Sequence, residues 1–196
     1  MPTRAPRIVP VHADGDAGGD AQRPRPPEAF ASALASLEQA LIRDDVVVAE
    51  APPPTRIAPF AAAFTLDLDD TASGRLVYLH DPAGQQAWQG QDRLVAFARV
   101  EVDDVMAADA LLADVVWAWL IEAMESRGAG LRVLGGTVTT TASRRYGNLE
   151  HLPPTQEVEL RCSWTPMPDA DGSLDLGPHM SGLVDTLAAM SGRPPA

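Results

Sequence analysis

Apolar residues recur at every second position in several stretches of the chain, which is the spacing of a β-strand with one buried face. In residues 156–164, for example, Val158, Leu160 and Cys162 alternate with charged or polar neighbours. The stretches that show this alternation, or a short apolar run between turn residues, are 60–68, 75–80, 93–102, 131–142 and 156–164. The sequence therefore predicts about five strands.

Three other stretches have the three-to-four-residue period of a helix with one apolar face. They begin near residue 28, at about residue 105 and at about residue 178, and Gly128 is placed to end the second of them. The resulting order is α-βββ-α-ββ-α. Because consecutive strands are joined by short links, we expect an antiparallel sheet with the helices on one face, which is an α+β fold.

The second helix, 105–127, is apolar around most of its circumference. One set of residues is expected to pack on the sheet, namely Leu112, Val115, Val116, Trp119 and Ala123. A second set, Trp117, Ile121 and Met124, needs another cover. The final helix would supply it in a monomer, and a second copy of the chain would supply it in a homodimer. The homodimer is favoured, because the final helix must also bury its own apolar face on the sheet.

Residues 1–27 are rich in Pro, Gly, Asp and Arg and have no apolar pattern, so we expect a disordered tail followed by a single domain, 28–196. No apolar run is long enough to cross a membrane, and the N-terminus does not have the pattern of a signal peptide. We therefore expect a cytoplasmic protein. The net charge of −12 argues against binding to nucleic acid.

The densest group of chemically useful residues lies in 74–90, where His80, Asp81 and Trp88 occur together. His80 could act as a general base held by Asp81, although neighbouring side chains on a strand point to opposite faces. The alternative is a simple hairpin, since Asp81-Pro-Ala-Gly has good turn chemistry. Farther along, Arg144 and Arg145 could bind a phosphate or a carboxylate, or make only surface ion pairs.

Other kinds of site have little support in the sequence. Cys162 is the only cysteine and shares its strand face with apolar residues, so we expect a buried, unreactive thiol. The four histidines have no metal-ligand spacing, and we expect no metal and no cofactor. No phosphate loop or dinucleotide fingerprint is present, and the chain contains no lysine.

The blocks GRLVYLHDPAGQQAWQG (74–90), GGTVT (135–139) and RCSWTP (161–166), with the Trp-Ala-Trp-Leu segment of the second helix, resemble an actinobacterial family of uncharacterised proteins, a domain of unknown function. The resemblance extends from about Pro27 to Pro195. It implies no activity and no catalytic residue. The order of elements is also weakly similar to the secretion-chaperone and YbjN-like fold, whose members are acidic, non-catalytic and often dimeric.

Two functions are consistent with these observations. The first is a non-enzymatic binding or adaptor protein that self-associates through Trp117, Ile121 and Met124 and binds a protein or peptide partner. The second is an enzyme or small-molecule-binding protein with His80, Asp81, Trp88, Arg144 and Arg145 around one pocket. The two are distinguished by whether these five side chains converge.

Overall fold

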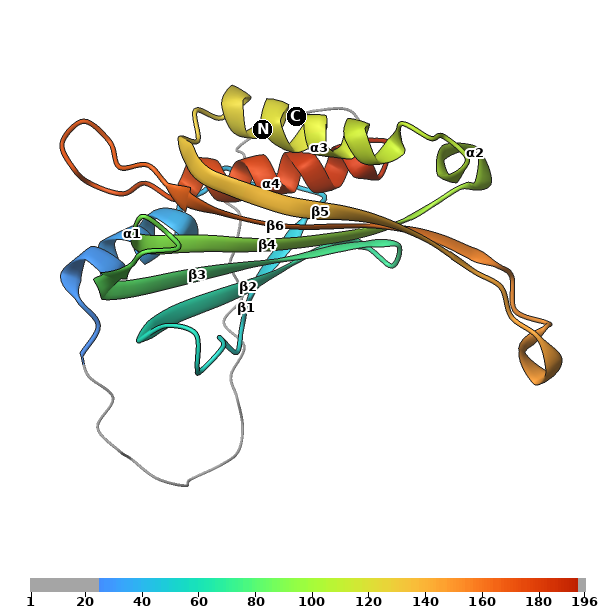
Figure 1. Cartoon of the computed structure of the whole chain (residues 1–196), viewed down its shortest axis with the longest axis horizontal. Coiled ribbons are helices and arrows are strands. Elements are labelled where there is room, and N and C mark those ends of the chain that lie inside the picture. Colours follow the sequence, from blue (N-terminus) through green and yellow to red (C-terminus); the bar gives the residue numbers. More distant parts are fainter. Residues whose placement is uncertain (1–24, 194–196) are drawn as a thin grey trace, which may run out of the picture.

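A computed structural model describes residues 25–193 (Figure 1). The elements in chain order are α1 (Glu28–Glu38), β1 (Val47–Ala51), β2 (Phe60–Asp69), β3 (Ala72–Gln85), β4 (Gly90–Val102), α2 (Asp104–Ala107), α3 (Leu112–Ser126), β5 (Leu131–Ser143), the short 3-10 helix η1 (Gly147–Leu149), β6 (Thr155–Pro166) and α4 (Gly177–Met190). The segment expected to be a disordered tail, 1–27, falls almost entirely outside the described residues.

The strands form one antiparallel sheet in the order β1-β2-β3-β4-β6-β5. The predicted α+β class and antiparallel sheet are confirmed, with six strands where about five were expected. The additional strand is β1, a short edge strand that ends just before the proline run 52–54. A further difference is that the predicted helix 105–127 is two helices, because the chain turns at Asp109, whose side chain accepts a hydrogen bond from the backbone N–H of Leu111.

The helices are stacked in two layers above one face of the sheet, with α4 against β2, β3 and β4 and with α3 outside α4 (Figure 1). Eleven of the fourteen residues of α4 are buried. The buried stripe of α3 is Leu112, Val116, Leu120 and Met124, and α3 rests mainly on α4 and β5. The prediction that α3 packs on the sheet therefore holds only at the edge strand β5, because α4 lies over β2, β3 and β4.

Close approach of the two helices depends on a glycine. A Cβ on Gly182 of α4 would lie 2.8 Å from the sulfur of Met124 and 3.3 Å from its Cα. Any larger residue at position 182 would push α3 outward.

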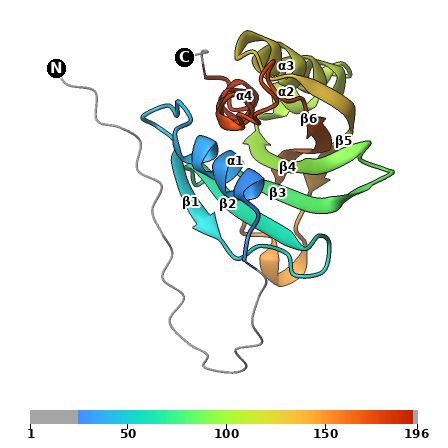
Figure 2. The same cartoon turned by 90° about the vertical axis from the view of Figure 1, so that its left-hand side faces the viewer.

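Helix α1 covers the same face of the sheet at the other side of α4 (Figure 2). The ring of Phe30 stacks on the ring of Tyr78 from β3, with centroids 5.1 Å apart and an interplanar angle of 9°. The helices thus lie on one face, as expected from the sequence. The two long hairpins end at opposite sides of the molecule, since β3–β4 turns beside α1 whereas β5–β6 extends beyond the sheet and carries η1 at its tip (Figure 1).

Candidate ligand-binding site

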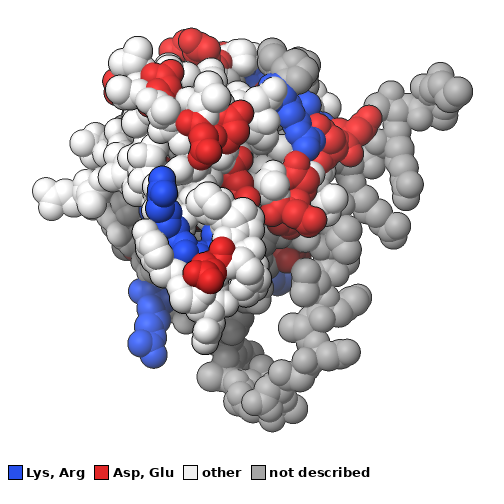
Figure 3. All heavy atoms as spheres, turned by 90° about the vertical axis from the view of Figure 1, so that its right-hand side faces the viewer, with Lys and Arg blue, Asp and Glu red and all other residues white. Residues whose placement is uncertain are grey.

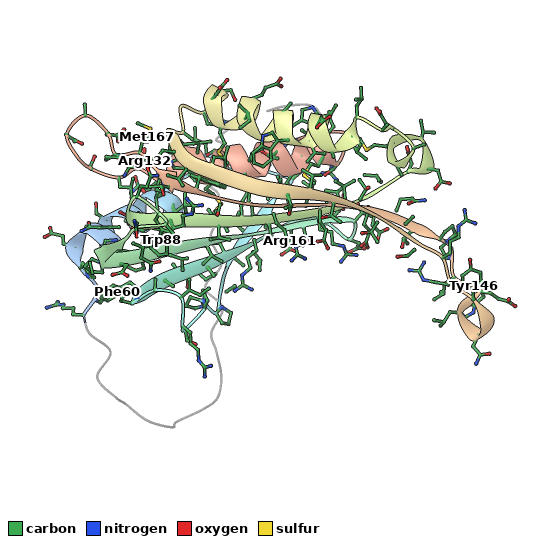
Figure 4. All side chains as sticks on the ribbon, in the orientation of Figure 1. Phe60, Trp88, Arg132, Tyr146, Arg161 and Met167 are labelled. Carbon is green, nitrogen blue, oxygen red and sulfur yellow. The ribbon has the colours of Figure 1, made fainter. Side chains whose placement is uncertain are left out.

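The five residues proposed as a site lie at opposite ends of the sheet. Trp88 marks the turn of β3–β4, and Tyr146, the neighbour of Arg145, marks the tip of β5–β6 (Figure 4). Arg144 is exposed, and Arg145 donates a hydrogen bond to the carbonyl of Pro153 within its own hairpin. The structure therefore does not bring the arginine pair to the hairpin 74–90.

Asp81 and Trp88 have structural roles in their hairpin. The carboxylate of Asp81 accepts hydrogen bonds from the backbone N–H of Ala83 at 3.0 Å and from the side chain of Gln85 at 3.2 Å. Trp88 is buried, and its carbonyl accepts a hydrogen bond from the hydroxyl of Thr165 on β6. The predicted turn at 81–84 is wrong: these residues form an irregular part of β3, the hairpin turns at 86–89, and Asp81 does not hold His80.

The partner of His80 is Asp92, which faces it across the β3–β4 ladder. Oδ1 of Asp92 lies 2.8 Å from Nδ1 of His80 and accepts a hydrogen bond of 2.7 Å from the hydroxyl of Tyr78. Burial, with the bond to Asp92, raises the pKa of Tyr78 far above its usual value, so this hydroxyl stays a donor. Because a carboxylate only accepts hydrogen bonds, Nδ1 of His80 carries the hydrogen.

The other ring nitrogen of His80 faces a cavity of about 450 Å³. The cavity lies between α1, the start of β4, the start of β5 and the loop that follows β6, and both Tyr78 and Asp92 contribute to its wall. Only 3% of His80 is exposed, yet Nε2 has no hydrogen-bond partner among the described residues. Since no fully buried side-chain nitrogen or oxygen in that part of the chain lacks a partner, Nε2 must be accessible from the cavity.

Arg132, near the start of β5, also lines this cavity, and its side chain is exposed to solvent. It forms no hydrogen bond, ion pair or cation–π contact with any residue that the structure describes. Three other exposed arginines of residues 25–193 share this property, namely Arg25, Arg56 and Arg144. Arg132 therefore presents a guanidinium at the edge of the cavity whose donors are free of the described protein and available to a ligand.

The position of Arg132 depends on a glycine in the facing hairpin. A Cβ on Gly90 would lie 3.0 Å from Nη2 of Arg132. Because residue 90 has no side chain, the guanidinium can lie across the start of β4 on the same side of the molecule as Trp88 (Figure 4).

A strained bulge follows Arg132. Between the pairs Arg132–Thr165 and Gly135–Ser163, β5 contains one residue more than β6. Val133 within this bulge has a φ of 52°, which is costly for a β-branched residue. Its carbonyl accepts a 2.9 Å hydrogen bond from the guanidinium of Arg93. Bulges of this kind redirect side chains next to functional sites.

The residues proposed as a dimer interface are partly internal. Met124 is fully buried between α3 and α4, so it cannot contribute to a contact between folded protomers. Trp117 and Ile121 are half-buried, and the Trp117 ring lies over Gly136 of β5. The sequence pattern detected the second apolar face of α3, but the face lies largely against α4 and β5.

Two further expectations concern reactive groups. Cys162 is buried as predicted, and burial raises the pKa of its thiol to about 12, which suppresses the nucleophilic thiolate. Within residues 25–193, no three His, Cys, Asp or Glu side chains are grouped so that they could hold a metal ion. The chemistry that the cavity offers is therefore hydrogen bonding and charge, supplied by Arg132 and by the chain Tyr78–Asp92–His80.

None of the helices in the described part of the chain combines the length and the apolar character needed to cross a membrane. A search of curated proteins and a search of solved structures each found no match, so the likeness to the secretion-chaperone and YbjN-like fold has no support from known structures. A family model described as "Protein of unknown function (DUF3000)" matches residues 26–196, the whole region that carries the sheet, the helices and the cavity. The chain therefore belongs to the DUF3000 family.

Proposed function

We propose that the protein binds a small organic anion in the cavity between α1, β4 and β5. The observation that carries the proposal is Arg132, an exposed guanidinium without a partner among the described residues, which lines the same cavity of about 450 Å³ as the buried His80. Such a guanidinium can contact a ligand carboxylate or phosphate with two parallel hydrogen bonds. The cavity volume is within the usual range for small-molecule sites.

His80 adds a second recognition point. Its Nδ1 hydrogen is committed to Asp92, so Nε2 is the ring nitrogen that is left to hydrogen-bond the ligand. Tyr78, through its own bond to Asp92, restricts the carboxylate and hence the orientation of the imidazole. The ligand class that satisfies both ends of the site is an anion that also has a polar group able to hydrogen-bond Nε2 of His80.

Binding is favoured over self-association as the function because of where the side chains lie. Met124, one of the three residues of the proposed interface, is buried in the core of the protomer. The proposed pocket, in contrast, contains His80 together with Asp92, Tyr78 and Arg132. Self-association through the half-exposed Trp117 and Ile121 is a separate proposal that light scattering of the purified protein tests.

The test is NMR titration of the full chain with inorganic phosphate, citrate and malate. Concentrations up to about 10 mM detect any Kd in the millimolar range or tighter. At least one of these anions should shift the resonances of the His80 ring and of the Gly90 amide. Arg132→Gln should weaken that binding by about tenfold or more, which is the expected effect of losing a charge-assisted hydrogen bond.

The matched control is Arg144→Gln, which removes the same charge from an exposed arginine at the other end of the sheet. It should bind as the wild type does. A second variant, Gly90→Val, should displace the guanidinium without changing charge and should weaken binding as Arg132→Gln does. The proposal fails if none of the three anions binds, or if Arg132→Gln and Arg144→Gln have equal affinity.

A further inference from the structure

A second concave surface lies on the helical layer, away from the anion site. It is a groove of about 610 Å³ between α2, α3 and the end of α4. Its apolar lining comes from Met106, Trp119, Ala123 and Ala189, and the Trp119 ring is half-buried there. A tryptophan at the base of an open groove is the residue type most often found as an anchor point for another protein.

The helices α2 and α3 beside this groove are rich in carboxylates, of which Glu122 lines the groove itself. Residues 103–126, which include all of α2 and α3, contain six carboxylates and no lysine, arginine or histidine. None of the six forms an ion pair with a residue that the structure describes. Figure 3 views the α2 end of the molecule, and carboxylates are spread over its upper part among mostly uncharged surface, with basic side chains at the upper right. These unpaired charges produce a negative potential around the apolar groove.

The charged residues at the rear of the groove are already neutralised within the protein. Arg193 donates hydrogen bonds to Asp45 at 3.0 Å and to Asp69 at 2.5 Å. Asp185 accepts two hydrogen bonds from Arg127, the shorter of 2.6 Å. The unpaired negative charge that a partner would meet in the groove itself is therefore that of Glu122 on α3.

Two exposed apolar side chains lie close to Met106 in the sequence. Val105 of α2 is 83% exposed, and Leu111, which directly precedes α3, is 62% exposed. Exposed aliphatic residues on segments that also carry a groove and several carboxylates are typical of an interaction surface.

We infer that this groove is the docking site for a basic amphipathic helix of a partner protein. The apolar stripe of such a helix would occupy the groove over Trp119 and Met106, and its lysines or arginines would meet Glu122 and the carboxylates of α2 and α3. A helix of about four turns matches the length of α3. The inference is independent of the anion site, because the two surfaces share no residue.

The test uses a fluorescently labelled synthetic peptide with leucines at helical i, i+3, i+4 and i+7 spacing and lysines elsewhere, measured by anisotropy against the full chain. Its twin has glutamate in place of every lysine, and a third peptide has the same composition in scrambled order. The amphipathic lysine peptide should bind, and both comparison peptides should bind at least about tenfold more weakly.

Two variants show whether the groove is the site. Trp119→Ser keeps the net charge and should weaken binding by about tenfold or more, as expected for a central anchor. Glu122→Gln with Glu125→Gln should weaken it by about threefold or more. The matched control is Glu38→Gln with Glu50→Gln, two exposed glutamates on α1 and β1, which should change affinity little.

The inference is overturned if Trp119→Ser, shown to be folded by circular dichroism, binds the peptide as tightly as the wild type. It is also overturned if the two double variants weaken binding equally, which would mean attraction to overall negative charge. A wild-type dimer that Trp119→Ser converts to a monomer would assign the groove to a second copy of the chain and would equally exclude the basic helix.

Discussion

The indole N–H of Trp164 donates a hydrogen bond to Nδ1 of His179 across 3.1 Å, joining the C-terminal end of β6 to the first turn of α4. Both side chains are buried. Because Nδ1 is the acceptor, the imidazole is neutral, and its hydrogen is on Nε2. Burial lowers the pKa of His179 to about 4, an effect that the negative charge of Asp175 only partly offsets.

This pKa predicts a loss of stability in mild acid. The unfolded chain binds a proton at His179 with the ordinary pKa of 6.5, whereas the folded protein does so only near pH 4. The stabilising contribution is therefore complete above pH 6.5 and is lost as the pH falls from 6.5 to about 4. Between about pH 7.5 and about pH 5 the free energy of unfolding should fall by about 2 kcal/mol from this residue alone.

Urea denaturation at the two pH values measures this loss, and His179→Gln is the control. The glutamine carbonyl can still accept from Trp164 but does not titrate, so the variant should lose about 2 kcal/mol less than the wild type. Carboxylates that titrate in the same range affect both proteins and cancel in the comparison. Equal losses in the two proteins would contradict the assignment.

The two adjacent glycines of β5 should differ sharply in their tolerance of substitution. A Cβ on Gly136 would lie 2.5 Å from the carbonyl oxygen of Arg161, 2.7 Å from Cβ of Cys162 and 2.9 Å from the ring of Trp117. Nothing lies within 4 Å of a Cβ on Gly135. We expect Gly136→Ala to lower the free energy of unfolding by about 1–3 kcal/mol through overpacking.

Gly135→Ala should stay within about 1 kcal/mol of the wild type, because added bulk meets open space and the unfolded chain loses some freedom. Urea denaturation of both variants makes the comparison. If Gly135→Ala is as destabilising as Gly136→Ala, then loss of glycine flexibility in β5 explains the effect, and close packing of Trp117 on this strand does not.

The alternation of apolar residues was enough to predict most of the sheet, because a strand with one buried face leaves a period of two in the sequence. It did not reveal β1, whose five residues precede a proline run and form only an edge of the sheet. The pattern of apolar residues also did not predict that α3 and α4 stack in two layers. Both α3 and α4 have apolar residues on several sides, and only the small residue Gly182 marks which faces meet.

The candidate site was predicted in part. His80 stood out as a histidine in a hairpin, but its partner depends on the register of β3 and β4, which places Asp92 opposite it and Asp81 in the irregular stretch of β3 that follows His80. Arg132 was not recognised, since a single arginine at a strand end has no motif. The sequence features that could have indicated Arg132 were the glycine at position 90 and the irregular spacing of β5 near Gly135. They can be interpreted only when the pairing of the strands is known.

The strained residue of that bulge allows a final prediction. Val133 has a φ of 52°, where a β-branched side chain costs about 1–3 kcal/mol and glycine costs almost nothing. Val133→Gly should therefore relieve backbone strain. This gain should offset the lost side-chain packing and the greater freedom of the unfolded chain, leaving the free energy of unfolding within about 1 kcal/mol of the wild type.

The matched control is Val138→Gly. Val138 is a half-buried valine of the same strand without positive φ, so its replacement relieves no strain and should lower the free energy of unfolding by about 1–2 kcal/mol. Thermal and urea denaturation of the two variants give the comparison. Equal destabilisation would show that the Val133 backbone is not strained, whereas the predicted difference, together with weaker anion binding by Val133→Gly, would show that the strain is maintained to hold Arg132 at the cavity.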